Sequence, residues 1–276
     1  MKTVRIAACT FFLTTLGTAN AIAIVSSASG DNPAAISSTV DAYRVSLGAQ
    51  NPNTAGSVGS GRREINWDGV PNAFSAPNNL PANFFNANSP RGAVFSTPGI
   101  GFQVSAQSGN PTSTAVEFGN LNASFPSMFA TFSPQRLFTA LGSTVTDVNF
   151  FIPGSTIPAT VSGFGAIFTD VDLPDVSSLQ FFDQSNASLG LFYVPPTVGR
   201  NEALSFVGVL FTTERISRVR ITAGDQSLTD PGFGDVVAMD DFIYAEPIPE
   251  PQTLALLLAG LGLVGLAVKR ARKGNP

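Results

Sequence analysis

Seventeen consecutive residues near the C-terminus, Gln252 to Val268, carry no charge, and only Gln252 and Thr253 are polar. About 17 residues is the shortest helix that spans a bilayer. A segment in lipid must satisfy its backbone N–H and C=O groups internally, and Leu and Ala, which fill more than half of this stretch, favour a helix. We therefore predict a transmembrane helix over 252–268, which leaves the preceding chain on one side of the membrane. The alternative is a buried hydrophobic helix at the end of a domain.

Two short motifs flank this apolar stretch. Pro249-Glu250-Pro251 precedes it and Lys269-Arg270-Ala271-Arg272-Lys273 follows it. The basic cluster predicts a cytoplasmic C-terminus, with the rest of the chain outside. In this order the three parts resemble the PEP-CTERM sorting signal of Gram-negative bacteria. The resemblance implies recognition by exosortase, a membrane transpeptidase-like protease, with cleavage near Pro249, Glu250 and Pro251 and release or anchoring outside the cell.

The N-terminus has the pattern of a secretory signal peptide. Lys2 and Arg5 precede an apolar core over 6–16, and Ala19-Asn20-Ala21 provides a small-x-small cleavage site. We predict that residues 1–21 form a signal helix that the secretion machinery removes. The one cysteine, Cys9, lies inside this segment, so the mature fold has no disulfide. The protein is expected to be anchored in the inner membrane by its C-terminal helix before processing, and then to reach the cell surface or the extracellular space.

The charges of the middle of the chain differ from those of its ends. Six of the 15 basic residues lie in the two terminal segments, which leaves nine arginines against 19 acids and a net charge of −10 between them. An acidic body argues against nucleic acid and anionic membrane surfaces as partners. An acidic surface suits solubility outside the cell or the binding of calcium.

From Arg63 onward, short apolar runs alternate with Pro, Gly and Asn. Runs rich in Val, Ile, Phe and Thr suit a half-buried sheet. We predict an all-β domain over 63–246, an antiparallel β-sandwich of jelly-roll type, with phenylalanine filling the layer between the sheets. Residues 22–62 are expected to form a preceding segment with a short helix, on which Val40, Tyr43 and Leu47 share a face, and a flexible loop. Residues 247–276 form the tail. The predicted strands are 92–96, 101–106, 115–119, 144–152, 160–170, 178–182, 189–194, 204–211, 216–222 and 236–244.

Histidine is absent from the whole chain. This excludes Ser-His-Asp and Cys-His catalysis and histidine-ligated zinc. Carboxylate chemistry and cations bound by oxygen remain.

The first candidate site surrounds the single tryptophan. Glu64, Trp67 and Asp68 are candidates for ligand contact. In an extended chain the two carboxylates lie about 13 Å apart on one face, wider than the roughly 5–9.5 Å of a glycosidase pair. The alternative is a structural corner, with Trp67 buried, Asp68 turning into Gly69 and Arg63 paired with an acid.

The second candidate site is a run of acids at a strand end. Asp170 and Asp172 are predicted on one strand face, and Asp175 follows Pro174 in the turn. Three such carboxylates can bind calcium. The alternative is a set of solvated loop acids.

The third candidate site spans Asp225 to Asp241. Asp225, Asp230 and Asp235 lie in a loop rich in Gly and Pro, and two further acids lie within the predicted strand 236–244. Asp240 and Asp241 alternate with apolar residues, so at least one is expected on an inward face. A buried carboxylate needs a donor, an arginine or a metal. The ending Asp240-Asp241-Phe242-Ile243-Tyr244 resembles the last strand of jelly-roll carbohydrate-binding modules, and that resemblance implies structural calcium at an aspartate. Hydrogen bonding or an arginine pair is the alternative.

Two classes of function follow. The first is a non-enzymatic surface or matrix protein, displayed or released through the tail and associated with exopolysaccharide. The second is a glycoside hydrolase or lyase that uses two carboxylates on the same scaffold. No cofactor other than structural calcium is expected.

Overall fold

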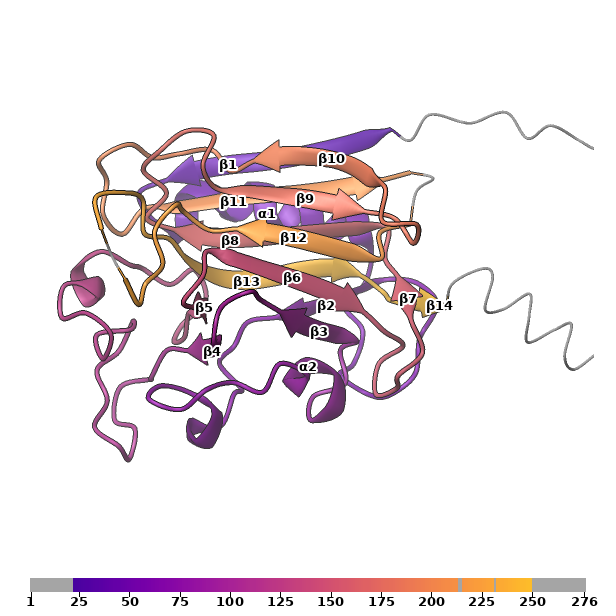
Figure 1. The fold of residues 1–276 in the computed structure, drawn as a ribbon. Helices are drawn as coiled ribbons and strands as arrows, with labels where there is room; N and C mark the ends of the chain where they lie inside the picture. Colours follow the sequence, from indigo (N-terminus) through magenta and orange to yellow (C-terminus); the bar gives the residue numbers. More distant parts are fainter. Residues whose placement is uncertain (1–21, 213–214, 231, 250–276) are drawn as a thin grey trace, which may run out of the picture.

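The computed structural model describes residues 22–212, 215–230 and 232–249, which form two antiparallel sheets packed face to face as a sandwich (Figure 1). The seven-stranded sheet has the order β1-β11-β8-β13-β5-β4, and β2 also pairs with β13. Its strands are β1 (Ala23–Gly30), β2 (Arg62–Ile65), β4 (Gly101–Val104), β5 (Phe138–Leu141), β8 (Gly163–Thr169), β11 (Leu204–Phe211) and β13 (Ala238–Ala245). The five-stranded sheet has the order β10-β9-β12-β6-β3. Its strands are β3 (Ala93–Ser96), β6 (Val145–Phe150), β9 (Ser178–Phe182), β10 (Ser188–Tyr193) and β12 (Arg218–Thr222).

Eight of these strands form a nested set of antiparallel pairs. The hairpin β9–β10 is innermost, and β8 with β11, β6 with β12 and β5 with β13 follow outward along the chain. Successive pairs alternate between the two sheets. Residues far apart in sequence therefore meet, and β13, the last strand of the two large sheets, lies in the middle of its sheet.

Phenylalanine rings connect the two sheets, as the composition predicts. Phe181 of β9 contacts Phe211 of β11 with 5.5 Å between ring centroids, and Phe95 of β3 contacts Phe138 of β5 at 5.3 Å. These rings pack edge-on or tilted, the arrangement that aromatic quadrupoles favour, and need no hydrogen-bond partner.

The helix α1 (Pro33–Leu47) covers the outer face of the seven-stranded sheet. It begins at Asn32, whose side chain accepts the Ala35 N–H at 3.3 Å, and ends at Gly48 with φ +98°. The predicted face of Val40, Tyr43 and Leu47 is buried. The Tyr43 hydroxyl donates to the Val209 carbonyl at 3.1 Å.

Three strand glycines make room for the Tyr43 ring. A Cβ built at Gly165 or Gly208 would lie 2.9 Å from ring atoms, and one at Gly163 would lie 3.1 Å from the hydroxyl oxygen. The bare backbone at these positions therefore lets the helix lie close against the sheet.

We expect Gly208→Ala to lower the free energy of unfolding by about 1–3 kcal/mol, because the new methyl group overpacks the contact with Tyr43. Urea unfolding measures the effect. Gly69→Ala is the matched control, because a Cβ at Gly69 meets no atom within 4 Å. Equal stability of the two variants would contradict this account of the helix–sheet contact.

Several elements differ from the predictions. The predicted strand 115–119 is wrong: Glu117 and Phe118 have φ of +48° and +61°, which a strand does not permit. Strands β1, β2, β5 and β14 (Ile248–Pro249) were not predicted. Residues 23–47, expected to precede the sandwich, supply its edge strand β1 and its covering helix. The small elements are η1 (Asn72–Phe74), α2 (Phe84–Ala87), η2 (Phe125–Ser127) and β7 (Ala159–Thr160).

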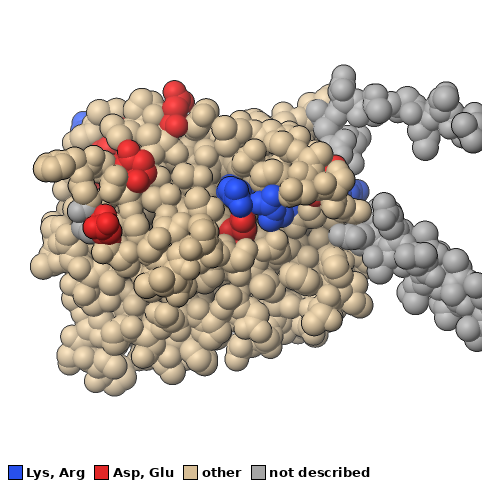
Figure 2. All heavy atoms as spheres, in the orientation of Figure 1, with Lys and Arg blue, Asp and Glu red and all other residues tan. Residues whose placement is uncertain are grey.

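The outer face of the five-stranded sheet has no helix over it in Figure 1, and it carries few charged side chains (Figure 2). Arg218 and Arg220 both pair with Asp147, at 2.9 and 2.8 Å. The guanidinium of Arg218 also lies 3.8 Å from the centroid of the Phe182 ring. The two guanidinium groups and the one carboxylate form a compact group with a net charge of +1 on a mostly uncharged face.

The start of β1 and strand β14 lie at the same end of the sandwich (Figure 1). None of the helices in the described ranges is long and apolar enough to cross a bilayer. The signal peptide predicted over 1–21 and the transmembrane helix predicted over 252–268 both lie outside the described residues.

Candidate functional site

A fully buried ion pair closes the domain at the end of β13. Arg63 of β2 donates to both carboxylate oxygens of Glu246, at 2.7 and 2.9 Å, and neither side chain is more than 1% exposed. The remaining Arg63 N–H groups donate to backbone carbonyls, including those of Gly56 and Pro90. Glu246 also accepts hydrogen bonds from the Asn51 side chain and the Val58 N–H, both at 2.9 Å. The pair thus joins the 51–58 loop to the last residues of the domain.

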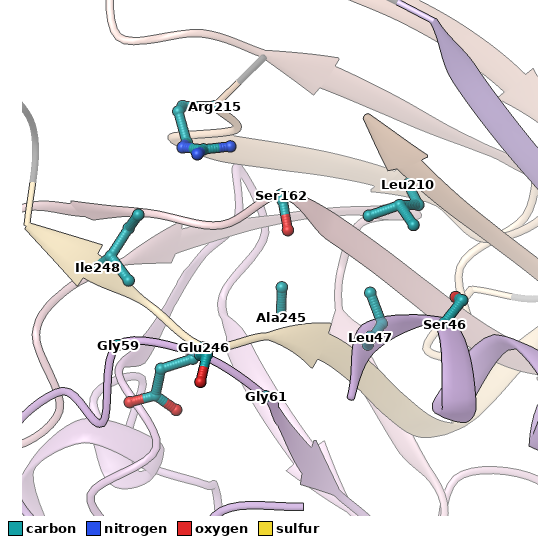
Figure 3. Close-up of a pocket in the computed structure, with 11 residues that line it drawn as sticks. Ser46, Leu47, Gly59, Gly61, Ser162, Leu210, Arg215, Ala245, Glu246 and Ile248 are labelled. Carbon is teal, nitrogen blue, oxygen red and sulfur yellow. The ribbon is translucent and has the colours of Figure 1, made fainter. Parts of the chain in front are cut away.

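The chain that follows Glu246 stays on the domain for three more residues. Pro247 is buried, and Ile248 and Pro249 form β14, which pairs with Thr160 and Ala159 of β7. A cavity of about 250 Å³ opens beside them, with Leu47, Arg215, Glu246 and Ile248 in its lining (Figure 3). Of the motif residues, Pro249 is therefore paired with the folded domain. Glu250 and Pro251 lie outside the described residues.

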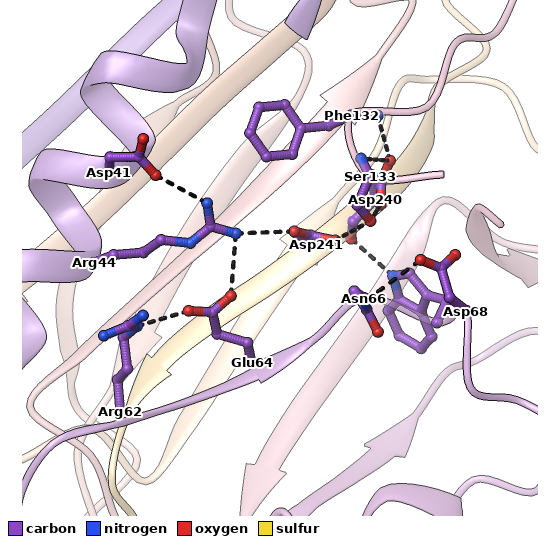
Figure 4. Close-up of polar contacts among 11 residues, drawn as sticks. Asp41, Arg44, Arg62, Glu64, Asn66, Asp68, Phe132, Ser133, Asp240 and Asp241 are labelled. Atoms are coloured by element: carbon purple, nitrogen blue, oxygen red, sulfur yellow. Dashed lines mark hydrogen bonds and ion pairs between the residues drawn. The ribbon is translucent and has the colours of Figure 1, made fainter. Parts of the chain in front are cut away.

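Arg44 of α1 gathers acids from three elements (Figure 4). Its guanidinium donates to Asp41, Glu64 and Asp241, each at 3.1 Å. Glu64 is half-buried and also accepts from Arg62 at 2.6 Å. Glu64, a candidate for ligand contact, is thus engaged by two arginines, of which Arg44 fastens α1 to both β2 and β13.

Asp240 and Asp241 are both buried, because α1 covers one face of β13 and the sheet partner covers the other. Asp240 accepts the Phe132 N–H at 2.6 Å, and Ser133 donates its hydroxyl to Asp241 at 2.7 Å. Burial, and then the neighbouring Asp241, raises the pKa of Asp240 well above its ordinary value. Burial raises the pKa of Asp241 as well, although Ser133 and Arg44 oppose it. Hydrogen bonds and an arginine pair, the alternative to calcium, therefore account for the contacts of these two acids.

Trp67 and Asp68 have structural surroundings. Trp67 has no exposed surface, stacks on Phe138 at 4.2 Å and donates its indole N–H to the Asp240 carbonyl at 2.8 Å. A residue with no exposed surface cannot contact an external ligand in this conformation. Asp68 accepts the N–H groups of Gln135 and Arg136. Burial raises its pKa, against these hydrogen bonds. These contacts agree with the alternative to ligand contact, a structural corner in which Trp67 is buried and Asp68 lies at the turn.

The acids after β8 meet an acid from the third candidate region. The strand ends at Thr169, and Asp170 has φ +68°, so Asp170 and Asp172 do not share a strand face as predicted. Asp170 is 2% exposed, and its Oδ1 has no hydrogen-bond partner among the described residues. Buried Asp235 accepts the N–H groups of Asp172 and Leu173, each at 3.2 Å. Asp175 stays exposed in the turn.

This acidic group lacks the arrangement of a metal centre. In the described part of the chain, no three Asp, Glu or Cys side chains are placed to hold a metal ion together. Burial, together with the carboxylates of Asp172 and Asp235, raises the pKa of Asp170 to about 7. Asp170 therefore keeps its proton to a higher pH than an ordinary aspartate does.

We expect Asp170 to make stability fall as pH rises. The folded state holds its proton up to about pH 7, whereas an unfolded aspartate loses it near pH 4. The stabilising contribution is thus complete below about pH 4 and lost through pH 7. Asp170→Asn should be about 1–3 kcal/mol more stable than the wild type at pH 8, with a smaller difference at pH 5. Thermal unfolding at both pH values measures this.

Asp175→Asn, in the same turn, is the control and should follow the wild type. A pH-independent difference between Asp170→Asn and the wild type would contradict the assignment.

Adding calcium or a chelator during the same melts tests the predicted calcium site. Unchanged melting temperatures would contradict the calcium hypothesis.

Three of the residues described above, Arg44, Glu246 and Asp235, were not singled out from the sequence. Arg44 carries no signal beyond its place on the helix. Glu246 is an isolated acid, although a partner for Arg63 was one of the alternatives. Asp235 was one of several loop acids, and no local pattern linked it to Asp170, because the two lie 65 positions apart.

Comparison with known proteins gives a match in the tail of the chain. No curated protein and no solved structure matches the chain, and no homologue supports the resemblance of the β13 ending to carbohydrate-binding modules. One family model matches, the PEP-CTERM protein-sorting motif, over residues 247–273. The match begins at Pro247, so the first three matched residues are those that fold onto the domain. The chain therefore ends in a PEP-CTERM sorting motif, which implies an exported protein that exosortase processes for the cell surface.

Proposed function

We propose that this protein is a non-enzymatic surface or matrix protein, delivered by exosortase and associated with exopolysaccharide through its β-sandwich. The sorting motif at 247–273 is the observation that carries delivery. The acids that could serve catalysis support a non-enzymatic body, because most are bound to the fold itself. Glu64, Asp68, Asp240, Asp241 and Glu246 all accept bonds from arginines or backbone N–H groups.

The body is proposed to be a jelly roll. The nested pairs β5–β13, β6–β12, β8–β11 and β9–β10, alternating between two sheets, support this because a jelly roll is a long antiparallel hairpin rolled into a sandwich. Many jelly rolls bind sugars, but that is an analogy of fold alone. The association with polysaccharide therefore needs its own test.

Asp170 supports a second candidate, a glycoside hydrolase or lyase. A carboxyl group with its pKa raised to about 7 beside Asp172 and Asp235 has the character of a general acid. Against this, Asp170 is 2% exposed, and three cavities in the described part of the chain, of about 250, 270 and 370 Å³, are lined by other residues. Release of reducing ends from polysaccharides by the wild type, abolished in Asp170→Asn, would favour the enzyme.

Two experiments test the main proposal. Replacement of Pro249, Glu250 and Pro251 by alanine should leave the protein unprocessed in cells that contain exosortase. Unaltered processing would reduce the tail to a simple anchor.

The full chain, purified in detergent, should be retained by at least one polysaccharide in a binding screen, with and without calcium. Retention by none would remove the polysaccharide association.

A further inference from the structure

A cavity of about 370 Å³ lies between the segment that follows Trp67 and α2. One wall is aromatic: Phe74 and Phe84 meet edge to face at 5.7 Å, and Phe84 and Phe85 do so at 5.0 Å. Asn88, Ser89 and Arg91 supply the polar lining. The volume falls within the range of small-ligand sites.

The Arg91 guanidinium is bound by no acid in the described part of the chain. Its buried Nε has no hydrogen-bond partner among the described residues. The guanidinium instead lies over the Phe85 ring, 5.0 Å from the centroid. Its backbone is fixed, because the N–H donates to the Phe85 carbonyl and the carbonyl accepts the Tyr244 hydroxyl. Burial lowers the pKa of Arg91, but an arginine stays charged at neutral pH.

Arg136 also has a buried Nε without a partner, but its other guanidinium N–H groups donate to the Ser105 carbonyl and to Asn72. Arg63, Arg44 and Arg220 each hold a carboxylate, and the chain between its basic ends carries a net charge of −10. A desolvated donor without an acceptor is costly. An anion in the cavity would remove that cost, since a guanidinium matches a carboxylate or sulfate with two parallel hydrogen bonds.

The other lining groups suit a sugar ring. Phe74 is half-buried, so it offers a partly open aromatic surface against which the apolar face of a sugar can pack. Asn88 and Ser89 offer an amide and a hydroxyl for sugar hydroxyl groups. Phe85 contacts Trp67 at 5.3 Å, which ties this wall to the core and makes the cavity preformed.

We propose that this cavity binds an acidic sugar unit of a polysaccharide, with Arg91 receiving its carboxylate or sulfate and Phe74 packing against its ring. The proposal rests on the proposed polysaccharide association and names its site and ligand chemistry.

The test uses the full chain in detergent and three polymers: polygalacturonate for a carboxylate, dextran sulfate for a sulfate, and neutral dextran. We expect one of the anionic polymers to bind and dextran not to bind. Arg91→Gln should weaken binding about 10- to 100-fold, as expected for the loss of hydrogen bonds to a charged group. Arg91→Lys, which keeps the charge but loses the planar fork, should lie between. The preferred polymer identifies the anion.

Arg200→Gln is the matched control, because it removes one exposed arginine whose partner is Asp31. It should bind as the wild type does. Phe74→Ala tests the opposite wall if Arg91→Gln does not fold, and it too should weaken binding. Equal binding by the wild type, Arg91→Gln and Phe74→Ala would overturn the site but leave the polysaccharide association in place. Equal retention on dextran would overturn anion recognition. Retention by none of the three polymers would overturn the acidic-sugar site, whereas the polysaccharide association fails only if no polysaccharide of the wider binding screen is retained.

Discussion

Glu246→Ala should unfold more easily than the wild type by about 3–5 kcal/mol, the cost of leaving one partner of a buried ion pair uncompensated. The Arg63 side chain has no exposed surface, so its charge would stay buried after the carboxylate is lost. The Asn51 amide and the Val58 N–H would lose their acceptor as well. For a domain of this size the melting temperature should fall by roughly 6–20 °C. Urea and thermal unfolding measure the change.

Asp31→Ala is the control for this prediction. Asp31 and Arg200 form an ion pair at 3.1 Å, but both side chains are more than half exposed. An exposed pair contributes about 0–1 kcal/mol. Equal losses in Glu246→Ala and Asp31→Ala would show that the Arg63–Glu246 pair does not secure the end of the domain.

A disulfide between β14 and β7 should stop processing of the tail. Ile248 and Thr160 are directly opposite in the antiparallel pair, a spacing that suits a disulfide. Pro249 cannot present its backbone to a protease while it remains paired with Ala159. We therefore expect Ile248→Cys with Thr160→Cys to accumulate precursor in exosortase-containing cells, and a reductant to restore processing. Thr160 is a mild position to change, because its buried hydroxyl lacks a partner among the described residues.

The chain is well suited to this experiment, since its one native cysteine, Cys9, lies in the predicted signal peptide. Ser29→Cys with Ser205→Cys is the control, because these residues are opposite each other in β1 and β11, away from the tail. Its processing should match the wild type. Normal processing of the Ile248–Thr160 disulfide would show that the motif is read without leaving β7. Processing of the triple-alanine motif variant would instead contradict the role of exosortase.

Local patterns predicted most of the sandwich. Strands β9 and β11 have the predicted bounds, because alternating or continuous apolar runs between turn residues leave few other structures open. The buried face of α1 was predicted for the same reason. Strand β5 was missed because all four residues of Phe138–Leu141 are buried, so the strand has no exposed position that would give it an alternating pattern. Residues 115–119 were wrongly predicted as a strand, because the backbone of this short segment bends through positive φ at Glu117 and Phe118.

The candidate site was predicted only in part. The motif, the apolar stretch and the basic cluster follow one another directly along the chain, so the sorting motif could be identified from the sequence. The contacts that join the tail to the body could not. Arg63 and Glu246 are 183 positions apart, and Arg44 and Asp241 are 197 apart. The nested strand pairing brings them together, and no local pattern encodes such partners.

Export, the tail, an acidic histidine-free body and a β-rich fold all follow from composition and from neighbours along the chain. Burial follows from packing alone. The same carboxyl group can be a solvated loop acid or, like Asp170, a buried one with its pKa raised to about 7. An arginine can be paired with an acid or, like Arg91, left facing a cavity. These outcomes depend on desolvation and on charges from distant strands, and such quantities exist only once the sheets have packed.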